Sequence, residues 1–287
     1  MSGGIFSKGQ ENPAGAGAAW TETPPPMDAM ATPHAPRPNV AKPSPPTNRG
    51  PRWPWDGEPD YDACNFAICH LSHELPDRLR VDGRVHAETC LAAIGAIAGF
   101  SAQHALITYL KEVSDAATLK QLHTVSTITG GHYFFGEPLD RALLPVSRAD
   151  AESKLWSVAA GGAIAAGVDA SHLPDPQRMF AHVVNTLCGK HEGLPSVPER
   201  HLPQMPVKHL LRRVWPIAMG CFTGRPPNMP GDFAAARTKF WPAIAAHVAS
   251  ALIRQTRFAV DPRTGLIIVM ESGIYASKLT PAVLKTA

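Results

Sequence analysis

The most constraining feature of the sequence is a long apolar stretch, residues 89–110, that is rich in alanine and glycine. Three polar residues interrupt it near its middle, which leaves about a dozen purely apolar residues where a transmembrane helix needs about twenty. We therefore interpret the stretch as part of a buried helix that spans residues 83–111. The sequence predicts no membrane association.

Glycines within this helix indicate close packing against a neighbour. Gly95 and Gly99 lie four residues apart among alanines, so one helical face carries almost no side-chain bulk. A second segment, residues 158–167, contains Gly161 and Gly162 and has the same character. Because glycine in a helix costs roughly 1 kcal/mol relative to alanine, repeated glycines suggest a packing requirement. We expect these two helices to cross at the centre of the fold.

Further helices are indicated by apolar periodicity and by start signals. Apolar residues recur at intervals of three and four after Asp60, which predicts a first helix that ends at Pro76. Three more helices have N-terminal start signals, at Asp175, Pro206 and Asp232. Pro216 and Pro242 fall inside the last two, so each is expected to kink or stop its helix.

Two segments have the pattern of β-hairpins. Residues 122–135 contain β-branched and aromatic residues on both sides of a Gly-Gly pair. Near the C-terminus, residues 258–260 and 266–270 flank the turn-like segment 261–265. The predicted fold class is therefore mainly α, a multi-helix globular domain with a small antiparallel β-sheet or hairpins, preceded by a disordered tail.

The tail is predicted from its proline content. Residues 1–60 contain 13 of the 29 prolines and few large apolar residues, so this segment cannot offset the entropy cost of becoming ordered. We predict that residues 1–58 form a disordered proline-rich tail and that residues 59–287 form a single helical domain.

Two tryptophans, Trp53 and Trp55, stand among prolines at the end of this tail. They either fold back onto the domain as an anchor or form a docking motif for a groove in a partner protein. A second candidate for partner binding is the end of the first hairpin, where His132 and Phe134 lie on one face of the strand. The alternative is that this hairpin only contributes aromatic side chains to the core.

The distribution of charged residues and the spacing of the cysteines indicate which partners the protein can bind and where in the cell it lies. The 27 basic and 24 acidic residues are spread along the chain, so no basic patch predicts nucleic-acid binding. The five cysteines are irregularly spaced, with no C-x-x-C pair, and no apolar run near the N-terminus resembles a signal peptide. We expect reduced core thiols and a cytoplasmic location.

One group of residues has the spacing of a metal site. His70 and His73 lie three residues apart and His86 and Cys90 lie four apart, so each pair can project from one helical face and together they could bind zinc. The alternative is that these histidines are exposed or hydrogen-bonded and that Cys90 is a core residue. We favour this alternative and predict that the protein binds no metal and no cofactor.

Motifs for nucleophilic catalysis, phosphate loops and dinucleotide binding are absent from the sequence. We therefore expect a non-enzymatic protein-interaction or scaffold protein, which binds a protein partner or itself and uses its disordered tail for recruitment. The alternative function is a metal-dependent hydrolase that uses the His/Cys cluster on the first two helices. A helical bundle that binds a ligand in an internal pocket is a third possibility.

Overall fold

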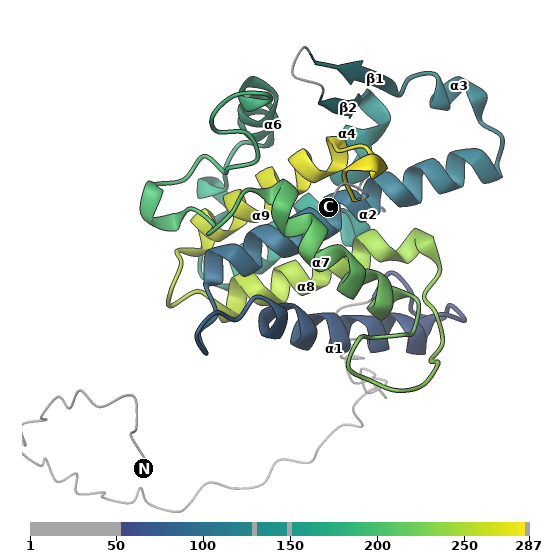
Figure 1. Ribbon diagram of the computed structural model, residues 1–287, viewed down its shortest axis with the longest axis horizontal. Coiled ribbons are helices and arrows are strands. Elements are labelled where there is room, and N and C mark those ends of the chain that lie inside the picture. Colours follow the sequence, from purple (N-terminus) through teal and green to yellow (C-terminus); the bar gives the residue numbers. More distant parts are fainter. Residues whose placement is uncertain (1–52, 128–130, 148–150, 285–287) are drawn as a thin grey trace, which may run out of the picture. The chain divides into compact units, whose positions relative to one another are not determined.

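The computed structural model describes residues 53–127, 131–147 and 151–284 (Figure 1). The elements in this part of the chain are, in order, α1 (Tyr61–Arg78), α2 (Ala87–Glu112), α3 (Ala116–Leu119), β1 (His123–Ser126), β2 (His132–Phe135), α4 (Glu137–Leu143), α5 (Leu155–Ala165), α6 (Pro176–Thr186), α7 (Val207–Phe222), α8 (Trp241–Gln255) and α9 (Pro262–Lys278). Short 3₁₀ turns lie between several of them.

The predicted fold class is confirmed, because the described residues are mainly helical and carry one small antiparallel sheet. Strands β1 and β2 form this sheet, in which His123 pairs with Phe135 and Ser126 pairs with His132. Residues 1–52 of the predicted tail lie outside the described residues. Residues 53–58, which the sequence assigned to the tail, belong to the folded unit.

The predicted C-terminal hairpin is wrong, because residues 262–278 form helix α9. Asp261 caps this helix by accepting a hydrogen bond from the Thr264 backbone N–H at 3.0 Å, and Pro262 occupies the first turn. Every residue from Leu266 to Leu279 is buried except Ile267. A helix that is covered on almost all sides shows no amphipathic stripe, so its β-branched residues resembled a strand.

Helix α2 forms the centre of the fold and packs against both α8 and α9 (Figure 1). A Cβ atom on Gly95 would lie 2.2 Å from the carbonyl oxygen of Val269, and one on Gly99 would lie 1.8 Å from that of Gly273. No side chain fits at these distances. The two glycines therefore allow the backbones of α2 and α9 to touch, which is the close approach that the sequence predicts.

The predicted partner of α2 is nevertheless wrong, because α5 packs mainly against α8 and not against α2. A Cβ atom on Gly162 would lie 2.6 Å from the Ser250 hydroxyl of α8, whereas Gly161 faces open space. Glycine spacing shows that a helix needs a close neighbour, but it carries no information on which neighbour that is.

Prolines end fewer helices than the sequence predicts. Helix α1 continues past Pro76, and α7 continues through Pro216. Helix α8 does not begin at Asp232 but at Trp241, so that Pro242 stands in its first turn, where its missing N–H costs nothing. The start of α6 is as predicted, since Asp175 accepts a hydrogen bond from the Gln177 backbone N–H.

Two sequence expectations concern burial. Among the described helices, α2 is the one whose length and composition would allow it to cross a bilayer, but 78% of its most apolar window is buried inside the protein. This burial is typical of a core helix. Of the five unpaired cysteines, Cys64, Cys90 and Cys221 are in the core as expected, whereas Cys69 and Cys188 are exposed.

Candidate functional site

The four residues of the predicted metal site do not converge. Among the described residues no group of three or more His, Cys, Asp or Glu side chains is arranged to hold a metal ion. His70 packs against Phe66, with 4.1 Å between the ring centroids. His86 caps α2 by accepting a hydrogen bond from the Thr89 backbone N–H, and Cys90 is buried.

Both tryptophans of the proline-rich segment pack on the helices. Trp55 is fully buried and its Nε1 donates a hydrogen bond to Asn65 at 3.3 Å. Trp53 stacks on Trp55, and the edge of His247 approaches Trp53 with 4.6 Å between the centroids. Burial lowers the pKa of His247 to about 4. This arrangement favours the anchor interpretation; docking into a partner stays a prediction and would require Trp55 to leave the core.

His132 and Phe134 lie on the face of β2 opposite to Tyr133. His132 is exposed and bonds with the Ser126 hydroxyl at 2.8 Å, whereas Phe134 is half-buried and Tyr133 is buried. The alternation agrees with the predicted strand geometry. His132 also lines a small hollow of about 150 Å³ together with Tyr133, Lys208 and Arg212. Partner binding by His132 and Phe134 stays a prediction.

Three buried polar side chains, those of Glu271, Tyr275 and Lys278, lie along one face of α9, and with their hydrogen-bonding partners they form the α9 network. The Glu271 carboxylate accepts hydrogen bonds from the backbone N–H and the hydroxyl of Ser196, at 2.5 and 2.6 Å. The Tyr275 hydroxyl donates to Glu192 at 2.5 Å. These contacts attach the long segment between α6 and α7 to α9.

Burial perturbs the ionisable groups of this network. It raises the pKa of Glu271 and of Tyr275, and it lowers the pKa of Lys278. The Lys278 ammonium lies 4.8 Å from the Phe135 ring centroid and 3.5 Å from Asp140 Oδ1. Such shifts often mark active sites. The space beside Glu271, however, is too small to hold a water molecule, so the network has no room for a ligand.

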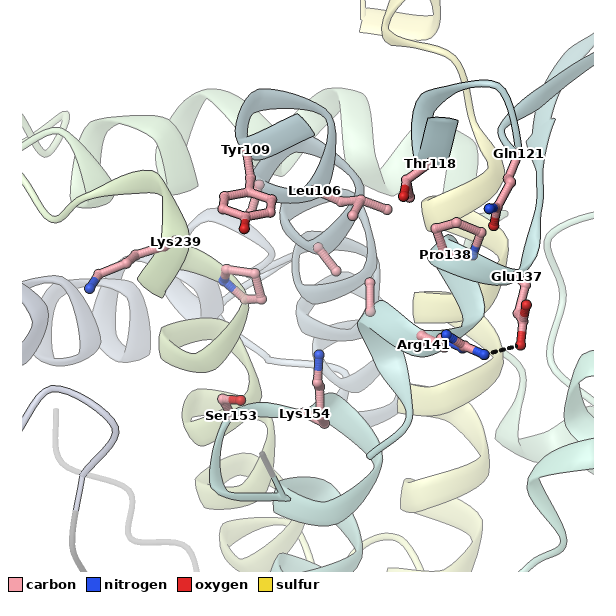
Figure 2. A pocket seen from close by; sticks show the side chains of 14 residues that line it. Leu106, Tyr109, Thr118, Gln121, Glu137, Pro138, Arg141, Ser153, Lys154 and Lys239 are labelled. Carbon is pink, nitrogen blue, oxygen red and sulfur yellow. Dashed lines mark hydrogen bonds and ion pairs between the residues drawn. The ribbon is translucent and has the colours of Figure 1, made fainter. Parts of the chain in front are cut away.

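Open space of ligand size lies along the C-terminal half of α2, in a pocket between α2, α3, α4, the residue pair before α5, and the start of α8 (Figure 2). Its volume is about 450 Å³, within the range typical of small-ligand sites. Small apolar residues form much of its lining, namely Ala102, Ala105, Leu106, Pro138, Ala142 and Pro242. Tyr109 stands at its edge and is 59% exposed.

The rim of this pocket is positively charged. Among the described residues, Arg141, Lys154 and Lys239 line it together with one carboxylate, that of Glu137. Figure 2 shows Lys154 pointing into the pocket, with Arg141 and Lys239 on its two sides. Arg141 pairs with Glu137 at 2.5 Å, and Lys239 pairs with Glu58 at 3.4 Å.

These ion pairs can exchange for a ligand. Both pairs are solvent-exposed, and pairs of this kind contribute about 0–1 kcal/mol to stability. A carboxylate of a ligand can therefore replace the Glu137 or the Glu58 carboxylate at low cost. With three cations and one anion on an apolar lining, the pocket is suited to an amphipathic anion, a group that joins an apolar side chain to negative charge.

A second groove, between α1 and α7, is less selective. It has a volume of about 480 Å³. Among the described residues that line it, two are acidic, Glu74 and Asp77, and three are arginines. The Asn228 amide also donates a hydrogen bond to Glu74, at 2.6 Å. Because its lining carries charges of both signs in similar number, this groove favours no single class of ligand.

Sequence reasoning missed the pocket because its residues are scattered between Ala102 and Pro242. No short motif links them, and each cation by itself resembles an ordinary surface residue. The three α9 residues of the α9 network, Glu271, Tyr275 and Lys278, do have a helical spacing, because the first two are four residues apart and the last two are three apart. Interpreting the preceding residues 266–270 as a strand concealed this signal.

A scan against protein-family models and searches of the curated proteins and of the solved structures found no match for this chain, so the candidate site stands on its own geometry.

Proposed function

We propose that this chain is a non-enzymatic protein-interaction protein, and that its pocket binds an acidic partner segment through one apolar side chain. The observation that carries the proposal is the combination of a small-residue apolar lining with a rim of three cations and one carboxylate. Apolar surface supplies affinity in such sites, and a few placed charges supply specificity.

The chemistry of the lining supports binding over catalysis. Among the described residues, its ionisable side chains are those of the three cations, Tyr109 and Glu137, and Glu137 is already paired with Arg141. The groups with perturbed pKa values near Glu271 lie elsewhere, in packed interior. A metal-dependent hydrolase, the alternative function, would require His70, His73, His86 and Cys90 to gather around one ion.

The test is binding of a defined peptide to the full-length protein. The probe is a fluorescent hexapeptide with one tryptophan between glutamates, and its counterpart carries lysines in place of the glutamates. We expect the acidic peptide to bind with Kd of about 10–1000 μM. Its affinity should fall as the salt concentration is raised, because the rim charges are exposed. We expect no binding of the basic peptide.

Two variants locate the site. Replacing both Arg141→Ala and Lys239→Ala removes two rim charges and should raise Kd about tenfold, whereas Ala105→Phe should fill the lining and abolish binding. The matched control is Arg178→Ala, since Arg178 is a 90% exposed cation of α6 outside the pocket. Equal binding of the two peptides, or an equal loss in the Arg178 control, would refute the proposal.

A further inference from the structure

We infer that the small hollow beside His132 binds a phosphate group. This hollow shares no lining residue with the pocket along α2, so the inference is independent of the proposed function. Three side chains that can carry positive charge line it, those of His132, Lys208 and Arg212, and no carboxylate is found among the described residues of its lining. Its volume of about 150 Å³ suits a small oxyanion, since pockets for drug-sized ligands measure about 300–1000 Å³.

The walls of the hollow come from β2, α7 and the chain after α9, and direct contacts hold them together. Tyr133 of β2 forms an isolated antiparallel bridge with Leu279, the residue that follows α9. Arg212 of α7 donates a hydrogen bond from Nε to the backbone carbonyl of Val283 at 2.7 Å. Because these contacts fix the walls relative to one another, a ligand pays little ordering entropy when it binds between them.

Two of the basic residues lie on one face of α7. Lys208 and Arg212 are four residues apart, which places their side chains next to each other on the helix surface. The contact of Arg212 with the Val283 carbonyl is to a neutral group, so it leaves the guanidinium charge in place. No carboxylate pairs with Lys208 in the described part of the chain. This face of α7 therefore supplies a pair of adjacent cations.

One carboxylate, that of Glu192, contacts a lining residue from outside the hollow. It accepts a hydrogen bond from the Tyr133 hydroxyl at 2.6 Å. It also accepts hydrogen bonds from the Tyr275 hydroxyl at 2.5 Å and from the Cys188 backbone N–H at 2.9 Å. Three donors already share this negative charge, and the carboxylate is not part of the lining, so the hollow keeps an excess of positive charge.

A phosphate group matches these donors better than a carboxylate does. A phosphate monoester carries a charge of about −1.5 to −2 at pH 7 and has three acceptor oxygens, and both lysine and arginine bind such oxygens through charge-assisted hydrogen bonds. The donors surround the hollow, because Lys208 and Arg212 lie on α7, the Thr280 hydroxyl follows α9, and His132 lies on β2. Nδ1 of His132 bonds with Ser126, which leaves Nε2 for a ligand. With two oxygens, a carboxylate reaches fewer of these groups.

The test is calorimetric titration of the full-length protein with potassium phosphate, with potassium chloride added to keep the ionic strength constant. We expect a Kd on the order of 1 mM. About 10 mM phosphate should then raise Tm by about 3 °C, because the ligand stabilises the folded state alone. Potassium acetate is the comparison anion and should bind at least about tenfold more weakly.

A third ligand, O-phosphoserine, distinguishes two sources of the same chemistry. If it binds as tightly as inorganic phosphate does, the site accepts phosphate monoesters, such as phosphorylated side chains. If the protein binds inorganic phosphate and rejects O-phosphoserine, the site accepts the free ion. Either result supports phosphate recognition by the hollow.

Variants of α7 locate the bound ion. Lys208→Ala should raise the Kd for phosphate about tenfold, and Lys208→Arg should restore most of the affinity because it keeps the charge. The matched control is Arg213→Ala, which removes an equal charge from the same helix. Arg213 donates a hydrogen bond to the Arg78 carbonyl at 2.9 Å and lines the groove between α1 and α7, not the hollow. Phosphate binding should be unchanged in this control.

The possible outcomes also separate this inference from the proposed function. Phosphate binding that is weakened in Lys208→Ala and kept in Arg213→Ala supports the site. No binding of phosphate, equal affinity for acetate, or an equal loss in Arg213→Ala overturns it. Lys208→Ala should leave binding of the acidic hexapeptide unchanged, so failure of the hexapeptide to bind would refute the proposed function and leave the phosphate site standing.

Discussion

The α9 network and the pocket along the C-terminal half of α2 differ in how they use polar side chains. Around α9, Glu271 and Lys278 are almost completely buried and their pKa values are perturbed, but the packing leaves no room for a ligand. At the pocket, Arg141 and Lys239 are exposed and weakly paired, and an apolar hollow lies between them. Buried charge here fixes the architecture, and exposed charge around empty space is available for recognition.

This comparison predicts first that the packed region tolerates almost no added volume. Gly99→Ala should destabilise the protein by at least about 3 kcal/mol, because its Cβ would lie 1.8 Å from the Gly273 carbonyl oxygen and two backbones would have to separate. The control is Gly161→Ala on α5, where the Cβ enters open space and better helix propensity should stabilise by up to about 1 kcal/mol. Urea midpoints of the two variants measure the difference. Equal stability of Gly99→Ala and the unaltered protein would contradict the contact between α2 and α9.

The second prediction concerns the pH dependence of the packed network. Burial raises the pKa of Glu271 in the folded state above its ordinary value, so the folded protein binds more protons than the unfolded chain between the two pKa values. The free energy of unfolding therefore falls as pH rises through this window. Glu271→Gln should remove this slope and increase stability at neutral pH by about 1–3 kcal/mol, because the amide can still bond with Ser196.

The matched control for this prediction is Glu137→Gln at the pocket. The Glu137 side chain is 64% exposed, so its loss should change the pH dependence of stability very little. Chemical denaturation between pH 4 and pH 8 compares the three proteins. A steeper slope in Glu271→Gln, or the same flattening in Glu137→Gln, would show that the buried carboxylate does not govern the pH response.

Local sequence patterns predicted those elements whose environment is asymmetric. Helix α6 has an apolar face, a polar face and a capping Asp175, and the sequence of the hairpin contains a Gly-Gly pair, so local patterns predict both. Helix α9 is buried on nearly every side and therefore lacks that asymmetry. The start signal Asp261-Pro262 was present, but the β-branched residues that follow it outweighed it in the interpretation.

Local sequence patterns could not predict which helix packs against α2, or that a pocket forms, for a different reason. Gly95 and Gly99 require a close backbone, and several helices of this chain could have supplied one. The pocket depends on the distance between residues of several separate elements, such as Tyr109 and Lys239. Neither relation is encoded within a window of one helix, and both follow only from the assembled fold.

The smallest predicted effect is on the stability of variants at the pocket rim. Arg141→Ala combined with Lys239→Ala removes two exposed ion pairs, each worth about 0–1 kcal/mol and opposed by the side-chain entropy that the pairs restrict. We expect the free energy of unfolding to change by less than about 1 kcal/mol, although the same variant should lose about tenfold in affinity for the acidic hexapeptide. Thermal unfolding and peptide titration of one preparation compare the two quantities. A large loss of stability without a loss of affinity would contradict this assignment. The rim charges would then stabilise the fold, which is the role assigned here to the α9 network.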